Sequence, residues 1–220
     1  MNRVSLLVAV ALCACLAATA SGLTKLQGGA AKDILSKLDC CIFDCDGVIW
    51  RGNELIPGVP ATLDKLRALG KKVFFVTNNS TKSRKGYLKK FRALGLSVEA
   101  EEIFSSSFAA AAYLEQNPLP ADKKVYVIGQ EGIGEELELL GIPYIGGPAD
   151  ADKAIELGPG VKVEHDGDVG AVVVGFDSHI SYYKIQYAQL CINQNAGCKF
   201  IATNLDAVTH LTAAQVWAGN

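Results

Sequence analysis

The 220-residue sequence has very little net charge. Its 21 lysines and arginines nearly balance its 23 aspartates and glutamates, which leaves a formal charge of -2 at pH 7. Binding to a phosphate backbone needs a basic face, so this balance argues against nucleic acid as the main partner. Half of the residues are hydrophobic and only 20% are charged. We therefore expect a globular protein of one or two domains with a large buried core.

The cysteines lack the spacing of a metal site or of a disulfide framework. Beyond the first 20 residues there are five, an odd number with no Cys-x-x-Cys pair: Cys40, Cys41, Cys45, Cys191 and Cys198. The first three lie in one short apolar run, where strand geometry keeps them from bridging one another, and we expect them to be small buried hydrophobes. A bridge between Cys191 and Cys198 is a minor alternative.

The amino terminus has the features of a removable targeting segment. Arg3 is followed by an apolar run at residues 4–18 and by the small-residue site Ala18-Thr19-Ala20. A spanning helix normally needs ~20 apolar residues, so we expect residues 1–20 to be a signal-type leader and no stable membrane association after its removal. An uncleaved anchor and a start-site artefact are the alternatives. A plastid reached through a signal-dependent route would reconcile this leader with free thiols; the cytoplasm and the secretory pathway stay open.

The first half of the remaining chain alternates between strand and helix patterns. An apolar run at 38–46 ends in carboxylates, a helical pattern at 57–70 follows, and the run at 72–77 is apolar on both faces. A strand, a helix and a strand over this length fit one right-handed crossover unit of a parallel sheet. The sequence therefore predicts an α/β fold.

The pattern restarts after residues 117–120, where two prolines mark a candidate boundary. We expect residues 35–115 to form the amino-terminal part of a core and residues 116–220 to form a second α/β unit. The strands expected in this unit are 124–129, 171–176 and 199–203. The helices expected in it are 131–140 and one that begins near Ser181. Residues 146–168 are rich in glycine and proline and should be mostly loop.

Asp44 and Asp46 close the first apolar run, and Gly47 follows them. At strand spacing both carboxylates point to one side, at the carboxyl end of a parallel sheet, where ligands bind in open α/β folds. Two such acids repel each other unless a hard cation lies between them, and Mg²⁺ suits oxygen ligands and phosphate. The chemistry that fits is phosphoryl transfer, with Asp44 attacking phosphorus and Asp46 as the acid and then the base. A calcium loop is disfavoured because apolar residues follow Gly47.

A polar segment ends the adjacent strand. Thr77, Asn78 and Asn79 offer a hydroxyl, amides and a helix amino terminus to an anion. In isolation this segment would be an ordinary capped turn, but one crossover away from the acidic pair it indicates a phosphate site. The basic side chains of the next helix are expected to form a solvated face: Lys82, Arg84, Lys85, Lys89, Lys90 and Arg92.

Three segments together carry a family resemblance: Asp44-Cys45-Asp46-Gly47-Val48-Ile49-Trp50, Thr77-Asn78-Asn79-Ser80-Thr81-Lys82-Ser83-Arg84 and Phe104-Ser105-Ser106-Ser107-Phe108. They resemble the haloacid dehalogenase-type phosphatases with a large cap domain, and within them the plant and algal 2-phosphoglycolate phosphatases. The resemblance runs from about residue 38 to the end of the sequence. It implies a Rossmann-like parallel core with an inserted α/β cap, a Mg²⁺ cofactor and a small phosphorylated substrate.

The same resemblance assigns roles to residues. Asp44 matches the nucleophile and a metal ligand, Asp46 matches the acid/base with its backbone carbonyl on the metal, and Thr77 and Asn78 match phosphate-binding groups. In this family the cap closes over the site and selects the leaving group. The further candidate substrate-binding residues are Gly47, Asn79 and His210. A solvent-exposed loop histidine is the alternative for His210.

Relatives in this family continue beyond the point where this sequence stops, with a lysine and a further acid that complete the core. The resemblance therefore implies an incomplete core and cap, with unpaired strand edges and exposed apolar surface. The expected function is hydrolysis of 2-phosphoglycolate. The alternatives are a truncated non-catalytic form that binds phosphate or a partner, and the same chemistry on pyridoxal phosphate or another small ester. Caps in this family often pair, so a homodimer through the cap is also open.

Overall fold

The computed structural model describes residues 29–209 and 217–219, so the expected leader at residues 1–20 lies outside the described residues. The chain divides into two compact units, one ending at Leu38 and one beginning at Asp39. In the first unit, helix α1 (Gly29–Lys37) carries an exposed ion pair between Lys37 and Asp33. None of the helices that the structure describes is long and apolar enough to cross a membrane.

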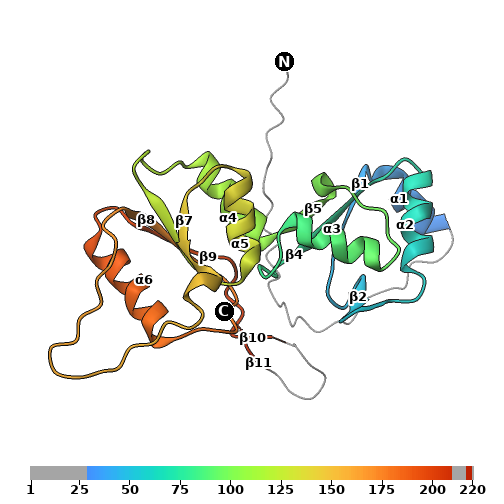
Figure 1. The fold of residues 1–220 in the computed structure, drawn as a ribbon. Coiled ribbons are helices and arrows are strands. Elements are labelled where there is room, and N and C mark those ends of the chain that lie inside the picture. Colours follow the sequence, from blue (N-terminus) through green and yellow to red (C-terminus); the bar gives the residue numbers. More distant parts are fainter. Residues whose placement is uncertain (1–28, 210–216, 220) are drawn as a thin grey trace, which may run out of the picture. The chain divides into compact units, whose positions relative to one another are not determined.

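The second unit begins with a three-stranded parallel sheet, in the order β1-β4-β5 (Figure 1). Its strands are β1 (Cys40–Asp44), β4 (Lys72–Thr77) and β5 (Ile103–Ser105). Helix α2 (Val59–Ala68) makes the crossover from β1 to β4. Gly58 precedes α2 with φ 88° and Gly70 follows it with φ 70°, a left-handed conformation that favours glycine and ends the helical run on both sides.

Two further helices and a short hairpin complete this part of the chain. Helix α3 (Arg84–Ala93) is capped by Ser83, whose hydroxyl accepts the N–H of Gly86, and α4 (Ser106–Gln116) is capped by Ser105. The 3₁₀ helix η1 (Ala100–Glu102) leads into β5. The hairpin comprises β2 (Trp50–Arg51) and β3 (Glu54–Leu55).

A second parallel sheet follows, in the order β7-β6-β8-β9. Its strands are β6 (Lys124–Ile128), β7 (Tyr144–Gly146), β8 (Val169–Val174) and β9 (Lys199–Ala202), and the elements between them are α5 (Glu131–Leu139), η2 (Gly147–Asp150) and α6 (Tyr182–Gln194). Alternate residues of β6 face opposite cores: Val125 and Val127 pack with α4 and α5, whereas Tyr126 packs with α6. The predicted α/β fold with parallel sheets is confirmed, and a short hairpin of β10 (Val208–Thr209) and β11 (Trp217–Ala218) ends the described chain.

Helix α4 shares its core with the second sheet. Ala110, Ala111 and Leu114 pack in the same cluster as Val125 of β6 and Leu137 of α5. The helix that precedes the predicted boundary therefore contributes apolar surface to the unit that follows it. The division at residues 115 and 116 stays a prediction.

Strand β1 departs from one expectation about the cysteines. All five described cysteines are free, but only Cys45 of the first three is buried; Cys41 is half-buried and Cys40 is exposed. The prediction of three buried thiols was wrong because β1 is the edge strand of its sheet and pairs only with β4 among the described strands. Ile42, on the same strand, is 66% exposed, so this edge presents apolar surface to solvent.

Candidate active site

A tight turn after β1 brings Asp44 and Asp46 to the end of the sheet. The carbonyl of Cys45 accepts the N–H groups of Ile49 at 2.8 Å and Trp50 at 3.2 Å, and the N–H of Gly47 donates to the Trp50 carbonyl at 2.7 Å. Gly47 has φ 84°, a backbone conformation that other residues adopt only with strain. The glycine that follows the acidic pair is therefore required by the turn itself.

The two carboxylates lie close enough to influence each other. Partial burial raises the pKa of the Asp44 carboxyl, a hydrogen bond from the Cys45 backbone lowers it, and the negative charge of Asp46 raises it further. Burial and the same two charges raise the pKa of the Cys45 thiol to about 12. A cysteine between two acids is thus held as a neutral thiol, and the chemistry of this turn belongs to the carboxylates.

Trp50 is a site residue to which the sequence reasoning gave no role. Its indole Nε1–H donates to Oδ1 of Asp46 at 2.7 Å, and the tryptophan is completely buried. Residues 47–49, between Asp46 and Trp50, form a turn, so no helix or strand periodicity in the sequence predicts this contact. It exists because the turn folds Trp50 back beside Asp46, where the two backbones form an isolated bridge.

The end of β4 lies beside the acidic turn. Asp44 pairs in register with Val76, so Thr77 is one residue beyond the paired position, as predicted for neighbouring parallel strands. Thr77 is buried, and its hydroxyl oxygen accepts the N–H of Asn79 at 3.2 Å. Asn79 in turn accepts two hydrogen bonds from Thr81, at 2.8 and 2.7 Å. The polar segment is therefore an ordered turn next to the two carboxylates.

Asn78 is held by residues from two distant parts of the chain. Its carbonyl accepts the hydroxyl of Ser106 at 2.7 Å and the side-chain amide of Asn204 at 3.0 Å, while its own side-chain amide donates to Asp206. The loop after β9 thus reaches the polar turn. His210, the candidate substrate-binding residue that follows β10 in the sequence, lies outside the described residues.

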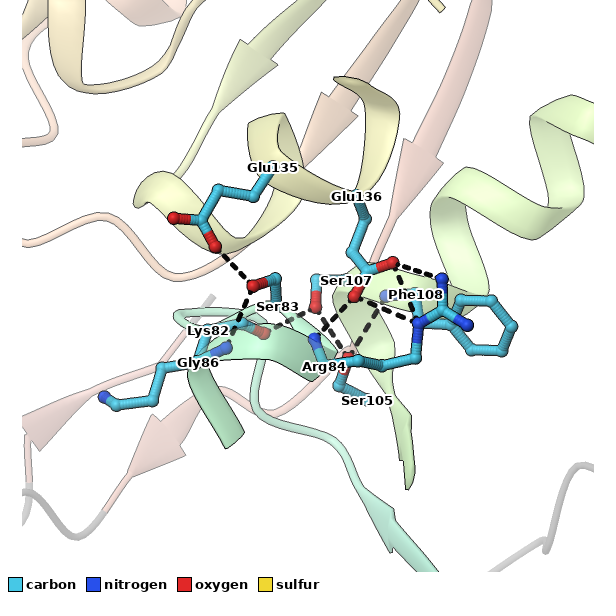
Figure 2. Close-up of polar contacts among 9 residues, drawn as sticks. All are labelled: Lys82, Ser83, Arg84, Gly86, Ser105, Ser107, Phe108, Glu135 and Glu136. Carbon is cyan, nitrogen blue, oxygen red and sulfur yellow. Dashed lines mark hydrogen bonds and ion pairs between the residues drawn. The ribbon is translucent and has the colours of Figure 1, made fainter. Parts of the chain in front are cut away.

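Helices α3 and α5 are joined immediately after the polar turn (Figure 2). The Glu136 carboxylate accepts the Arg84 backbone N–H at 2.5 Å and its guanidinium at 2.9 and 3.0 Å, and Glu135 accepts the Ser83 hydroxyl. The guanidinium also lies 3.9 Å from the centre of the Phe108 ring. The expected solvated basic face was therefore wrong for Arg84, because a buried glutamate from a distant helix pairs with it.

The donors at this site suit a hard cation. Asp44 and Asp46 are adjacent carboxylates, and no group of three or more histidine, cysteine, aspartate or glutamate side chains suited to a metal occurs among residues 29–209 and 217–219. Mg²⁺ typically binds proteins through one or two carboxylates and keeps several waters or substrate phosphate oxygens. A pair of aspartates at the rim of a sheet fits that requirement, whereas a zinc-type cage would need more protein ligands.

Known proteins that are similar to this chain include a family of hydrolases and two named phosphatases. A family model described as haloacid dehalogenase-like hydrolase matches residues 41–143. The chain is 66% identical over 189 residues to chloroplastic phosphoglycolate phosphatase 1A of Arabidopsis thaliana, covering 86% of this chain and 52% of that protein. It is 42% identical over 178 residues to 4-nitrophenylphosphatase of Schizosaccharomyces pombe, covering 80% and 59%.

A solved structure is also similar to this chain in sequence and fold. A hypothetical protein from Pyrococcus horikoshii is 32% identical and superposes with a TM-score of 0.67, over 83% of this chain and 64% of that one. The chain spans about half the length of the first of these curated relatives.

Proposed function

Because the chain belongs to the haloacid dehalogenase-like hydrolases, we propose that it is a Mg²⁺-dependent phosphomonoester hydrolase that acts on 2-phosphoglycolate and releases glycolate and phosphate. The observation that carries the proposal is the acidic turn of Asp44 and Asp46, which adjoins the ordered polar turn at Thr77. Pyridoxal phosphate or another small ester would require the same groups.

In the proposed reaction Asp44 attacks the phosphorus atom and the bond from phosphorus to the ester oxygen breaks. Asp46 gives a proton to the departing oxygen, so the alcohol leaves neutral and an aspartyl-phosphate forms on Asp44. Asp46, now ionised, takes a proton from water as that water attacks phosphorus. Phosphate is released and Asp44 is restored as a carboxylate. The pKa of Asp44 is raised by burial and by Asp46, so a cation beside the pair would favour its ionised, nucleophilic form.

Mg²⁺ would be held by the Asp44 carboxylate and the backbone carbonyl of Asp46, and it would offset the charge of the phosphoryl group when bound. Thr77, Asn78 and Asn79 would orient the phosphate, with Gly47 allowing close approach of the backbone. His210, which follows β10 in the sequence, is a further proposed substrate contact. The hydrogen bonds of Asn78 with Asn204 and Asp206 support a substrate site that the loop after β9 borders.

The setting of the enzyme is part of the same proposal. The Arabidopsis relative is named as chloroplastic, and the leader-like amino terminus of this chain is compatible with a plastid location. The cytoplasm and the secretory pathway are the alternative locations. The partner is a small phosphorylated molecule, and pairing of two chains through the second sheet is compatible with it.

A second candidate function is a non-catalytic form that binds phosphate or a protein partner. The observation that favours it is the uncovered edge of β1, where Ile42 is 66% exposed and Cys40 is exposed. An apolar strand edge of this kind is a template for pairing with another chain.

The test measures phosphate release from 2-phosphoglycolate by the purified 220-residue protein, with Mg²⁺ and with a chelator. We expect metal-dependent turnover that Asp44→Asn abolishes. Asp39→Asn is the matched control, because Asp39 is an exposed aspartate beside the other end of β1. Turnover that survives Asp44→Asn would contradict the proposed mechanism. Phosphate or partner binding without turnover would favour the second candidate.

A further inference from the structure

The side chain of Asp46 is held on one oxygen only. Oδ1 accepts the indole N–H of Trp50 at 2.7 Å, whereas Oδ2 has no hydrogen-bond partner among the described residues. An indole N–H can donate but never accept, so the direction of this bond is fixed. Oδ1 is therefore committed as an acceptor, and Oδ2 is the oxygen left to carry or receive a proton.

The indole ring itself cannot turn. Two side chains of α3 pack against it: the Tyr87 ring stacks at 6.4 Å with an angle of 15°, and the Phe91 ring meets it edge-on at 4.9 Å and 67°. Both are buried, and Trp50 has no exposed surface. Because the Trp50 backbone also closes the turn that carries Asp46, the donor is fixed relative to the carboxylate at both ends.

A positive charge lies on the face of the same ring. The Nζ atom of Lys90 is 4.2 Å from the centre of the Trp50 ring; burial lowers the pKa of Lys90, and the negative charge of Asp46 acts on it in the opposite direction. The sequence predicts Lys90 in a solvated face, yet it is half-buried here. A cation over an indole draws electron density toward the ring face, which makes the N–H at the ring edge a stronger donor.

We infer that Trp50 is a positioning residue that holds Asp46 by Oδ1 and directs Oδ2 toward the leaving oxygen of the substrate, with Lys90 strengthening the hold. This inference rests on the proposed role of Asp46 as acid and base. Without the indole N–H, the carboxyl could rotate about its terminal bond and present either oxygen in either direction. Proton delivery would then suffer while substrate binding would not.

The dependence of rate on the leaving group separates this role from a general structural one. The ester oxygen of glycolate is a poor leaving group and needs a proton as it departs, whereas 4-nitrophenolate departs readily without one. General acid catalysis contributes typically ~10²–10⁴-fold, so we expect Trp50→Phe to lower kcat/KM for 2-phosphoglycolate by about 10–100-fold. For 4-nitrophenyl phosphate the expected loss is less than about threefold, because the acid contributes little to that step.

The experiment compares both substrates in the wild type, Trp50→Phe, Asp44→Asn and Tyr126→Phe. The last is a matched control: it also removes the one polar atom of a buried aromatic ring, a phenol that donates to the buried Asp150 at 3.1 Å in the second sheet. We expect this control to leave both kcat/KM values unchanged. Lys90→Gln keeps the whole aromatic core and supplies the test should Trp50→Phe fail to fold; its expected effect is a smaller loss that is again confined to 2-phosphoglycolate.

The outcomes separate the positioning role from the proposed function. Equal losses on both substrates, or no loss, in Trp50→Phe and Lys90→Gln would overturn the positioning role while leaving an Asp44-dependent enzyme in place. A wild-type chain without turnover on either substrate, or one that keeps turnover in Asp44→Asn, would overturn the proposed function and the role of Trp50 with it.

Discussion

The contact between Arg84 and Glu136 permits a quantitative test of what joins the two sheets. Glu136 lies on α5 with no exposed side-chain surface, and the Arg84 side chain on α3 is 22% exposed. Glu136→Gln keeps the size of the side chain but removes its charge. Arg84 would then remain beside a neutral amide, whose nitrogen end repels the donors that the carboxylate accepts (Figure 2).

The magnitude follows from the burial of the two partners. Removing one member of a buried ion pair costs about 3–5 kcal/mol, and the partial exposure of Arg84 places this case at the lower end, about 3 kcal/mol. For a chain of this size each kcal/mol lowers the melting temperature by about 2–4 °C, so the expected fall is about 6–12 °C. The double variant Arg84→Met with Glu136→Leu should recover part of this loss, because an apolar pair leaves no charge without a partner.

Thermal unfolding followed by circular dichroism measures this effect, with Glu138→Gln as the control. Glu138 lies on the same helix, is exposed, and accepts the phenol of Tyr144 at 2.9 Å, so its replacement should change the free energy of unfolding by less than about 0.5 kcal/mol. If the Glu136 and Glu138 variants unfolded at the same temperature, the ion pair would contribute nothing and the reasoning would be refuted.

Two further predictions concern packing and thiol reactivity. Gly132→Ala should destabilise the protein by more than about 2 kcal/mol in chemical unfolding, although alanine has the better helix propensity, because the added methyl carbon would lie 2.5 Å from the backbone of Lys82. The control Gly134→Ala places its methyl carbon against the end of the Tyr144 side chain and should destabilise the protein less. Equal losses of stability in the two variants would contradict this packing. Iodoacetamide at pH 8 should label the exposed Cys40 and leave Cys191 unlabelled, as measured by peptide mass spectrometry. Burial raises the pKa of Cys191 to about 12, so little of its thiolate is present at pH 8. Rapid labelling of Cys191 in the folded protein would contradict its burial.

The larger elements could be predicted from the sequence because their signals are local. The run at 72–77 is apolar on both faces and forms β4 with the predicted bounds, and Gly58 and Gly70 delimit α2 as expected. The acidic pair and the polar turn could be placed side by side because carboxyl ends of neighbouring parallel strands meet at one edge of a sheet. The register of Asp44 with Val76 accords with that reasoning.

Other features depend on contacts that no local pattern encodes. Strands β5 and β7 are three residues long, and each exists because a longer neighbouring strand supplies its hydrogen bonds. Arg84 and Glu136 are 52 residues apart in the sequence, so the local pattern of basic residues predicts a solvated helix face although Arg84 is paired with a buried glutamate. Trp50 and Lys90 likewise meet only after the turn and α3 pack together.

The central claim is that Asp44 accepts a phosphoryl group. The most direct measurement is to quench the protein in acid during turnover of phosphorus-labelled 2-phosphoglycolate in the presence of Mg²⁺, and to locate the label by peptide mass spectrometry. The account predicts an acyl phosphate on Asp44, absent from Asp44→Asn and removed by hydroxylamine. Turnover with no label on Asp44, or with a label on any other residue, would contradict it.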